Sequence, residues 1–163
     1  MGKAYANKKQ KHLRPKGDLY VTPRSLIWVM EKFIKNNFVS SEDILEPCAG
    51  NQDIVKPLEK LGYRCIVNDI SYKDGMDYLI TPFDYEQIIT NPPFSLWDDF
   101  VLKAKSEAQK IMVLGRLNYL GTNSRYRSGI WNGLKSVHVF NRYVDYQTPS
   151  RDDGLFPVAI APT

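Results

Sequence analysis

Hydrophobic and polar positions repeat with different periods along the chain, and each period predicts a different element. Between residues 23 and 38 apolar side chains recur every three to four positions, which is typical of a helix with one buried face. Thr22 and Pro23 suit the N-cap and the first helical position, and we expect Asn36 and Asn37 to end the helix. The residues predicted for its buried face are Leu26, Ile27, Met30, Phe33 and Ile34.

Short apolar runs predict buried strands, and the amphipathic stretches between them predict helices. From residue 44 onward strands and helices alternate, which favours a mostly parallel, doubly wound α/β sheet with helices on both faces. The predicted strands are 44–45, 64–70, 85–90 and 111–117, and the predicted helices are 54–63 and 95–110. The inner face of the second helix is predicted to hold Leu96, Phe100, Val101 and Ala104.

The pattern changes after Arg116, where a loop-rich stretch with one short helix precedes two further strands. Residues 1–17 lack apolar periodicity, so we expect a disordered basic tail followed by one domain over residues 18–163. Within that domain, residues 116–155 are the candidate substrate-contacting region. The two further strands are predicted at 136–140 and 155–161.

Charge is distributed unevenly along the 163 residues, whose net formal charge is +4. Residues 1–17 carry six Lys/Arg and no Asp/Glu, residues 18–102 carry seven basic and 14 acidic residues, and residues 103–163 carry nine basic and four acidic residues. Basic ends around an acidic middle favour contact with a polyanion. A solvated tail that aids solubility fits the same pattern.

Composition disfavours several classes of site and location. Cys48 and Cys65 are the only cysteines, which predicts neither a disulfide framework nor a cysteine-rich zinc site. His12 and His138 show no metal-ligand spacing. No apolar run approaches the ~20 residues of a membrane span, and the N-terminal residues show no signal-peptide pattern. We expect a protein of a reducing compartment without a bound metal.

Polar groups follow the first two strands of the alternating region. The loop "EPCAG" places Glu46 and Gly50 just after one strand, where Gly50 lets the backbone approach a ligand closely. Asp69 comes 19 residues later, at a spacing that suits a carboxylate binding ribose hydroxyls. Since no G-x-G-x-x-G is present, an adenosine-type ligand without a pyrophosphate fits better. Plain turns with capping residues are the alternative for both features.

The tetrapeptide Asn91-Pro92-Pro93-Phe94 ends the strand predicted at 85–90. Two prolines fix φ and remove two backbone donors, so they hold the nearby carbonyls in fixed directions. Asn91 adds a side-chain carbonyl, and Phe94 adds a flat ring. Such a site can hold a planar amine-bearing ring and accept hydrogen bonds from its NH2 group. The alternative is a tight turn with Phe94 packed on the sheet.

In order and spacing, the stretches "LYVTP", "ILEPCAG", "VNDI", "IITNPPFSL" and "GRLNYL" resemble the motifs of class I S-adenosylmethionine-dependent amino-methyltransferases. The nearest likeness is to small DNA adenine-N6 methyltransferases of bacteriophages and bacteria. It implies a Rossmann-like fold, S-adenosylmethionine as cofactor with S-adenosylhomocysteine as product, DNA as partner, and a cytoplasmic location in a bacterial or infected host cell. One departure is Gln52, which stands where the family's A-G-x-G loop has its second glycine.

The resemblance also implies roles for single residues. Asn91 Oδ1 and the Pro92 carbonyl would accept hydrogen bonds from the target amine, while Phe94 would stack on a base flipped out of the duplex. Asp69 would bind the ribose hydroxyls, and Asp77 the adenine amine of the cofactor. The implied catalytic residues are Asn91, Pro92, Pro93 and Phe94. The implied cofactor-binding residues are Thr22, Pro23, Glu46, Pro47, Cys48, Ala49, Gly50, Asp69, Asp77 and Asn91.

Basic side chains supply the candidates for phosphate contact. Arg125 and Arg127, with Tyr126 between them in a polar stretch, are the foremost candidates. Surface ion pairs and solvated charges explain such residues equally well. The candidates for nucleic-acid contact are Lys8, Lys9, Lys11, Arg14, Arg116, Arg125 and Arg127, with Lys135 and Arg142 as further basic positions. The aromatic residues expected in the core or a pocket wall are Trp97, Tyr119 and Trp131.

The sequence leaves three functions open. Methylation of an exocyclic base amine, with adenine N6 in DNA as the best match, is the leading interpretation. An RNA base or a protein glutamine is the alternative substrate, and a non-catalytic cofactor-fold module that binds nucleic acid is the third possibility. A chain of this length has little room for a separate target-reading domain, so we expect low or short sequence specificity, or a partner.

Overall fold

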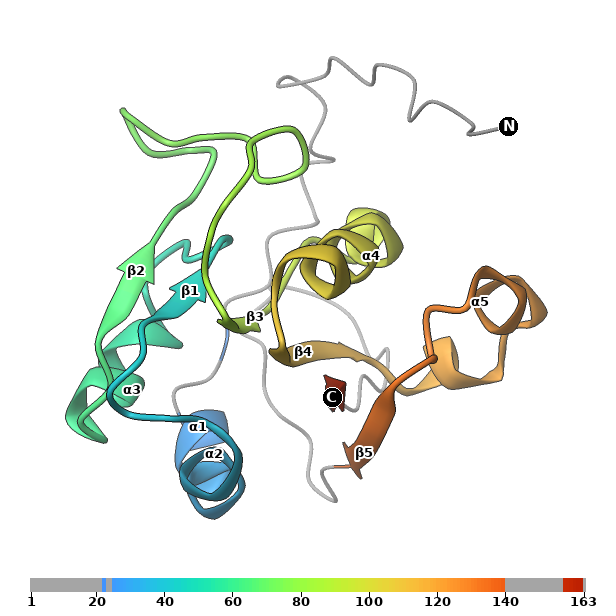
Figure 1. The fold of residues 1–163 in the computed structure, drawn as a ribbon, viewed down its shortest axis with the longest axis horizontal. Coiled ribbons are helices and arrows are strands. Elements are labelled where there is room, and N and C mark those ends of the chain that lie inside the picture. The colour runs from blue at the N-terminus through green and yellow to red at the C-terminus, as the bar shows by residue number, and fades with distance from the viewer. Residues whose placement is uncertain (1–21, 23–24, 140–156, 163) are drawn as a thin grey trace, which may run out of the picture.

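The computed structural model describes residue 22 and residues 25–139 and 157–162 (Figure 1). A six-stranded sheet has the order β2-β1-β3-β4-β6-β5. Its strands are β1 (Ile44–Glu46), β2 (Cys65–Val67), β3 (Gln87–Thr90), β4 (Lys110–Arg116), β5 (Leu134–Val139) and β6 (Pro157–Pro162). The helices are α1 (Ser25–Val29), α2 (Glu31–Asn37), α3 (Val55–Lys60), α4 (Trp97–Glu107) and α5 (Asn123–Ser128), with the 3-10 helices η1 (Phe94–Leu96) and η2 (Leu117–Gly121).

The strands β1 to β4 are mutually parallel, and β6 lies between β4 and β5, antiparallel to both. Every residue of β1 and β3 is buried, because helices cover both faces of the parallel part. This arrangement confirms the predicted doubly wound α/β sheet and the two strands expected after Arg116. The carboxyl ends of four parallel strands therefore meet at one edge.

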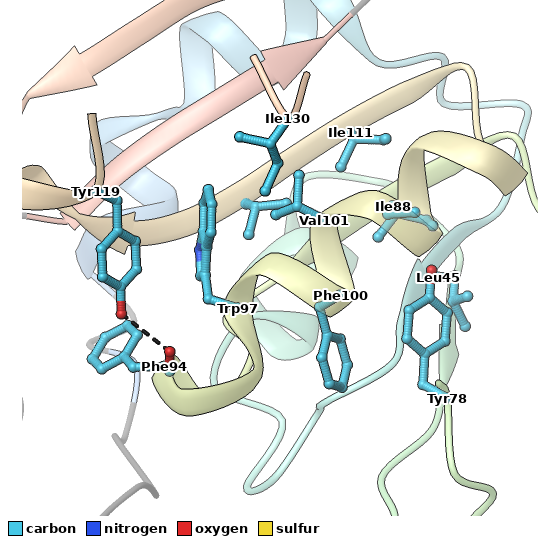
Figure 2. Close-up of a cluster of buried hydrophobic side chains, with 12 residues drawn as sticks. Leu45, Tyr78, Ile88, Phe94, Trp97, Phe100, Val101, Ile111, Tyr119 and Ile130 are labelled. Atoms are coloured by element: carbon cyan, nitrogen blue, oxygen red, sulfur yellow. Dashed lines mark hydrogen bonds between the residues drawn. The ribbon is translucent and has the colours of Figure 1, made fainter. Parts of the chain in front are cut away.

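Two apolar cores lie on opposite faces of the sheet. Successive strand residues point to opposite faces, so Ile44 and Ile89 pack in the core that contains residues of α1, α2 and α3. Leu45 and Ile88 pack in the other core, beneath Trp97 and its neighbours on α4. Figure 2 shows this second core, and Figure 1 shows α4 on the opposite side of the sheet from α1 and α2.

The helix predicted over residues 23–38 is interrupted at Met30, whose ψ of 0° separates α1 from α2. The helical spacing continues through the break, since Met30 N donates to Leu26 O at 3.1 Å and Ile34 N donates to Met30 O at 2.8 Å. All three residues are buried, as predicted, and α2 ends at Asn37. The amphipathic pattern therefore predicted the buried face correctly but not the break.

Gly115 breaks the apolar run of β4 because a tryptophan lies against it. Trp97 is almost fully buried, and its indole Nε1 donates to the Leu114 carbonyl at 2.7 Å. A Cβ atom on Gly115 would lie 2.8 Å from that nitrogen. The missing side chain lets the first residue of α4 pack directly on the strand and fixes the helix beside the end of β3.

Candidate active site

Four polar side chains stand along the carboxyl edge of the parallel strands. Glu46 is the last residue of β1, Asp69 follows β2, Asn91 follows β3, and Arg116 is the last residue of β4. The strands pair in parallel and in adjacent order, so these four positions share one edge, where ligands bind in open α/β sheets. The fold thus brings together residues that are far apart in the sequence.

Glu46 is fully buried and holds the ends of two strands together. Its Oε1 accepts hydrogen bonds from Cys48 N at 2.9 Å and from Thr90 Oγ1 at 2.7 Å. Its Oε2 is enclosed and has no hydrogen-bond partner among the described residues. Burial, with a smaller contribution from the negative charge of Asp69, raises the pKa of the carboxyl from 4.5 to about 8, although the hydrogen bonds from Thr90 and Cys48 oppose the change. A neutral carboxylic acid therefore predominates at neutral pH.

The loop after β1 is clamped through the peptide groups of Gly50. Asp69 Oδ2 accepts a hydrogen bond from Gly50 N at 3.0 Å, and the Tyr72 hydroxyl donates to Gly50 O at 2.6 Å. A Cβ on Gly50, whose φ is +47°, would meet nothing within 4 Å. Gln52 adopts a φ of +62°, which glycine tolerates far better than other residues. The loop thus has a glycine-like conformation at the position where the A-G-x-G motif has its second glycine.

Asp69 is buried, with contacts that the sequence did not predict. Besides the bond from Gly50, its Oδ1 accepts hydrogen bonds from Ser71 N at 2.8 Å and from Ser71 Oγ at 2.6 Å. The carboxylate therefore joins the loop after β1 to the loop after β2, and its contact with ribose hydroxyls stays a prediction.

The loop after β2 is fastened by an amide. Asn68 Nδ2 donates to Met76 O at 2.9 Å, and Met76 N donates back to Asn68 Oδ1 at 2.9 Å. Asp77 follows, half-buried, and its Oδ1 accepts a hydrogen bond from Leu79 N at 3.1 Å. Asp77 therefore caps a turn in this structure, and its contact with the adenine amine stays a prediction.

The side chain of Asn91 is oriented by Thr22, a residue 69 positions earlier in the chain. Asn91 Nδ2 donates to Thr22 Oγ1 at 2.9 Å, and Thr22 is itself buried. The amide carbonyl is thereby directed away from Thr22. Pro92 and Pro93 are buried behind it, and the Pro93 carbonyl accepts from Leu96 N at 3.0 Å, which starts η1. Of the two proline carbonyls, the one at Pro93 therefore serves the helical turn.

Phe94 does not present an open ring face in this structure. Its side chain is 8% exposed, and the Arg116 guanidinium carbon lies 4.6 Å from the ring centroid. The Tyr119 ring meets it edge-on at 6.3 Å, and the Tyr119 hydroxyl donates to the Phe94 carbonyl at 3.2 Å (Figure 2). This packing matches the alternative of a turn with Phe94 on the core. A base that stacks on Phe94 must first displace the Arg116 guanidinium.

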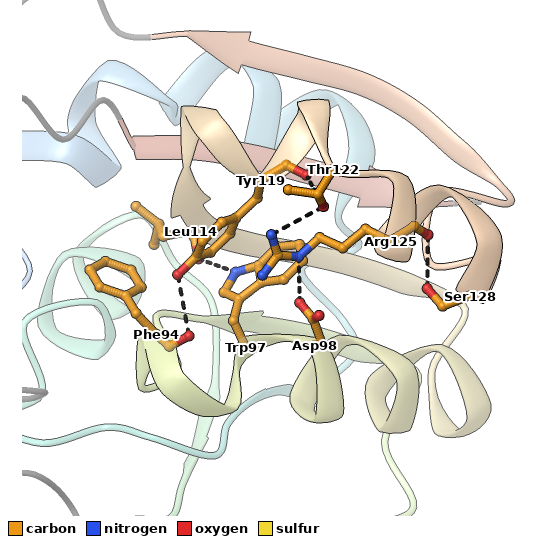
Figure 3. Close-up of polar contacts among 8 residues, drawn as sticks. All are labelled: Phe94, Trp97, Asp98, Leu114, Tyr119, Thr122, Arg125 and Ser128. Carbon is orange, nitrogen blue, oxygen red and sulfur yellow. Dashed lines mark hydrogen bonds and ion pairs between the residues drawn. The ribbon is translucent and has the colours of Figure 1, made fainter.

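Among the basic candidates, Arg125 differs most from its expected role. Its side chain is 16% exposed and forms an ion pair with Asp98, with Nε 2.6 Å from Oδ1 (Figure 3). This pairing matches the alternative of an ion pair within the fold, and a phosphate contact by Arg125 stays a prediction. Arg127 is exposed. The predicted residues that lie outside the described ones are Lys8, Lys9, Lys11, Arg14, Pro23 and Arg142.

Sequence reasoning missed two residues that hold the site, Thr90 and Tyr72, and it did not predict the hydrogen bond that Tyr119 makes. Thr90 bonds Glu46, Tyr72 bonds Gly50, and Tyr119 bonds Phe94. Thr90 was the one polar position in the apolar run before Asn91, and this was the available signal for it. Trp97 and Tyr119 are buried and Trp131 packs beside them, which confirms their predicted place in the core.

No group of three or more His, Cys, Asp or Glu within residues 25–139 is arranged to hold a metal ion. Nor does any helix in the described part of the chain have the length and apolar character needed to cross a membrane.

The chain is similar in structure to several solved proteins, although no protein-family model and no curated protein matches its sequence. A protein of Pyrococcus horikoshii, described as a "putative RNA methyltransferase", aligns with a TM-score of 0.63 and 12% identity over 84% of this chain and 80% of its own. A Thermoplasma acidophilum protein aligns with a TM-score of 0.57 and 15% identity over 83% and 85%. TehB of Haemophilus influenzae gives 0.53 and 8% over 83% and 61%. At these identities the likeness concerns the fold.

Proposed function

We propose that this chain transfers a methyl group from S-adenosylmethionine to an exocyclic amine of a nucleic-acid base. The chain has the Rossmann-like fold of class I methyltransferases. The observation that carries the proposal is the position of Asn91-Pro92-Pro93-Phe94. The tetrapeptide follows β3 at the edge where ligands bind, and Thr22 fixes the orientation of its amide. Adenine N6 in DNA is the target that the sequence motifs resemble most.

The residues at this edge fit the proposed cofactor. Glu46 Oε2 is an enclosed polar atom without a partner among the described residues, and the space beside Gly50 is open. Glu46, Gly50 and Asp69 would hold the cofactor, which supplies an electrophilic methyl group on a sulfonium. Because the sulfonium and ammonium groups of that cofactor are positive, they would favour the ionised form of Glu46 and lower its pKa. The carboxyl is thus suited to respond to the bound cation.

Asn91 would prepare the amine for attack. The lone pair of an exocyclic amine is delocalised into its ring, and acceptors for both N–H bonds favour a pyramidal nitrogen with a localised lone pair. Asn91 Oδ1, directed away from Thr22, and the Pro92 carbonyl would be those acceptors. The methylated nitrogen becomes acidic after transfer, so no strong base is required before attack. The rate gain would come mainly from positioning.

Other substrates fit the same acceptor geometry. The amide nitrogen of a protein glutamine or an amine of an RNA base has comparable N–H groups, and the Pyrococcus horikoshii protein is described by its RNA substrate. The basic ends of this chain favour nucleic acid over protein. In DNA the target base must leave the stack to reach this edge.

The test is transfer of a labelled methyl group to single- and double-stranded DNA, to RNA and to protein. Asn91→Ala removes the acceptor, and Thr22→Val removes only the group that orients it. Asn36→Ala changes an exposed amide in α2 and serves as the matched control. We expect loss of transfer in the first variant, a smaller loss in the second and native rates in the third. Equal transfer by Asn91→Ala and the native chain would exclude the proposed role of Asn91.

Calorimetry with S-adenosylmethionine separates the enzyme from a non-catalytic module. Binding of the cofactor together with methyl transfer is expected. Absence of binding, or binding without transfer to any of these substrates, would favour a module that uses the fold for recognition alone.

A further inference from the structure

The segment formed by η2 and α5, residues 117–128, lies beside the catalytic tetrapeptide. It follows β4 directly, and the Tyr119 hydroxyl donates to the Phe94 carbonyl at 3.2 Å. Figure 2 shows this bond at the end of the core that contains Trp97. The segment is therefore joined directly to the proposed base site.

Arg125 anchors α5 on α4. Its guanidinium carbon lies 4.0 Å from the centroid of the Tyr119 ring and 5.7 Å from that of Trp97, and its Nη1 is 3.4 Å from Thr122 Oγ1. Asp98, in the first turn of α4, supplies the opposite charge (Figure 3). Ion pairing, ring stacking and burial make Arg125 a structural residue, so the surface must be formed by its neighbours.

The opposite end of α5 is fixed as well. The Lys105 ammonium on α4 donates to the carbonyls of Gly129 at 2.9 Å and Ile130 at 3.0 Å, just beyond the C-terminus of α5. Gly129 adopts a φ of +71° and ends the helix. With both ends tied to α4, the short helix presents its outer side chains in a fixed orientation.

The outer side of α5 combines an aromatic ring with a cation. Tyr126 is 79% exposed, and Arg127 is exposed beside it. The exposed polar residues around them are Asn118, Asn123, Ser124 and Ser128. An unburied tyrosine next to an arginine suits a ligand that has a flat ring and a negative charge within one repeating unit.

The charge around this surface has one sign. No Asp or Glu occurs between Glu107 and Asp145 in the sequence, a stretch that contains six Lys/Arg. The acidic side chain that reaches the segment from α4, Asp98, is paired with Arg125. Since η2 and α5 contain no Asp or Glu, the local field around Arg127 favours a polyanion.

We infer that the outer side of α5 binds the nucleic-acid strand next to the target base, with a base stacked on Tyr126 and a phosphate paired with Arg127. Aromatic stacking together with a basic residue is the general means of holding a single strand. The inference rests on the proposed function for its substrate class. An acidic protein surface would use Arg127 but has no need of the exposed ring.

Fluorescence anisotropy with a labelled single-stranded oligonucleotide, across a salt series, tests the inference. Tyr126→Ala should weaken binding about tenfold, as expected for one stacked base, and leave the salt dependence unchanged. Arg127→Gln should weaken binding and lower the salt slope by about 1. Lys60→Gln, an exposed lysine on α3, is the matched charge control and should bind like the native chain.

Repeating the titration with Asn91→Ala separates this inference from the proposed function. Loss of methyl transfer is expected in that variant, while Tyr126→Ala and Arg127→Gln should still weaken its binding by the same factors as in the native chain. If the native chain transfers no methyl group while Tyr126→Ala and Arg127→Gln still weaken binding, the proposed function is wrong but the binding surface on α5 is supported. Native affinity in both α5 variants would contradict the inferred binding surface, whatever the transfer assay shows. Equal competition by polyglutamate at matched charge overturns the choice of a nucleic acid.

Discussion

Gln52 stands where the A-G-x-G motif that the first loop resembles has its second glycine, and it adopts a backbone conformation that suits glycine. A non-glycine residue in the left-handed region costs about 1–2 kcal/mol, and Gln52 adopts that conformation with a φ of +62°. Its side chain also hydrogen-bonds to Tyr72. The conformation of the loop is therefore maintained by its contacts rather than by a second glycine.

Replacing Gln52 by glycine and by alanine separates these two effects. Both variants lose the side-chain contact with Tyr72, but only glycine relieves the backbone. We expect Gln52→Gly to exceed Gln52→Ala in free energy of unfolding by about 1 kcal/mol, measured by urea denaturation. Equal stabilities would show that the loop changes conformation when the side chain is removed.

Glu46 makes the stability of the chain depend on pH in an unusual direction. Its pKa is about 8 in the fold, against an ordinary value of 4.5 for a solvent-exposed glutamate, so between these pH values the folded state keeps a proton that the unfolded state has lost. The contribution is complete below about pH 4.5 and is lost as pH rises toward 8. Paired carboxylates with lowered pKa values have the opposite dependence.

Glu46→Gln retains the shape of the side chain but has no carboxyl group to titrate. Relative to this variant, the native chain should lose free energy of unfolding on the order of 3 kcal/mol as pH rises from about 5 to 8. Denaturation curves at several pH values measure the difference. A constant difference between the two proteins would show that the Glu46 carboxyl is ionised throughout this range.

Packing between a helix and a strand explains why one glycine in β4 is required. A Cβ on Gly115 would lie within 3.2 Å of three atoms of the buried Trp97 indole, which is held by its bond to Leu114. We expect Gly115→Ala to lower the free energy of unfolding by about 1–3 kcal/mol through overpacking. Gly121→Ala, where a Cβ meets nothing within 4 Å, is the control and should change stability by less than about 0.5 kcal/mol. Similar unfolding midpoints for the two variants would contradict this account.

The elements themselves were largely predictable, because their signals are local. Apolar runs and helical spacing depend on neighbouring residues, so β1, β3, β4 and the buried face of α4 follow from the sequence. Side-chain direction after a strand is not local. Phe94 lies against Arg116 and Tyr119, residues contributed by the end of β4 and by η2, and its burial could not be read from the tetrapeptide alone.

The site as a whole was predictable in its position more than in its contacts. Parallel strands bring their carboxyl ends to one edge whatever the loops do, so Glu46, Asp69 and Asn91 had to be neighbours once the alternating pattern was recognised. The Thr22–Asn91 bond and the Asp98–Arg125 pair join segments distant in sequence. Such contacts depend on the packed molecule, and charge composition alone did not indicate that Arg125 pairs with Asp98.

The separation of charge along the chain leads to a prediction for the whole molecule. If the basic residues 1–17 contact nucleic acid, neutralising four of them should lower the salt slope of single-strand binding by about 3, at roughly 0.7 per released charge. The thermal unfolding midpoint should not change. The variant replaces Lys8, Lys9, Lys11 and Arg14 by glutamine.

A control with the same loss of charge distinguishes a contact made by the tail from a general effect of net charge. It replaces four exposed lysines of α2 and α3 by glutamine, namely Lys32, Lys35, Lys56 and Lys60. Steering by net charge would lower the affinity of both variants alike. Counterion release, in contrast, depends only on those basic side chains that contact phosphates. A lower salt slope in the tail variant alone would therefore assign those phosphate contacts to residues 1–17. Equal slopes in both variants would remove the tail from the binding surface and leave α5 with Arg116 as the basic groups next to the proposed base site.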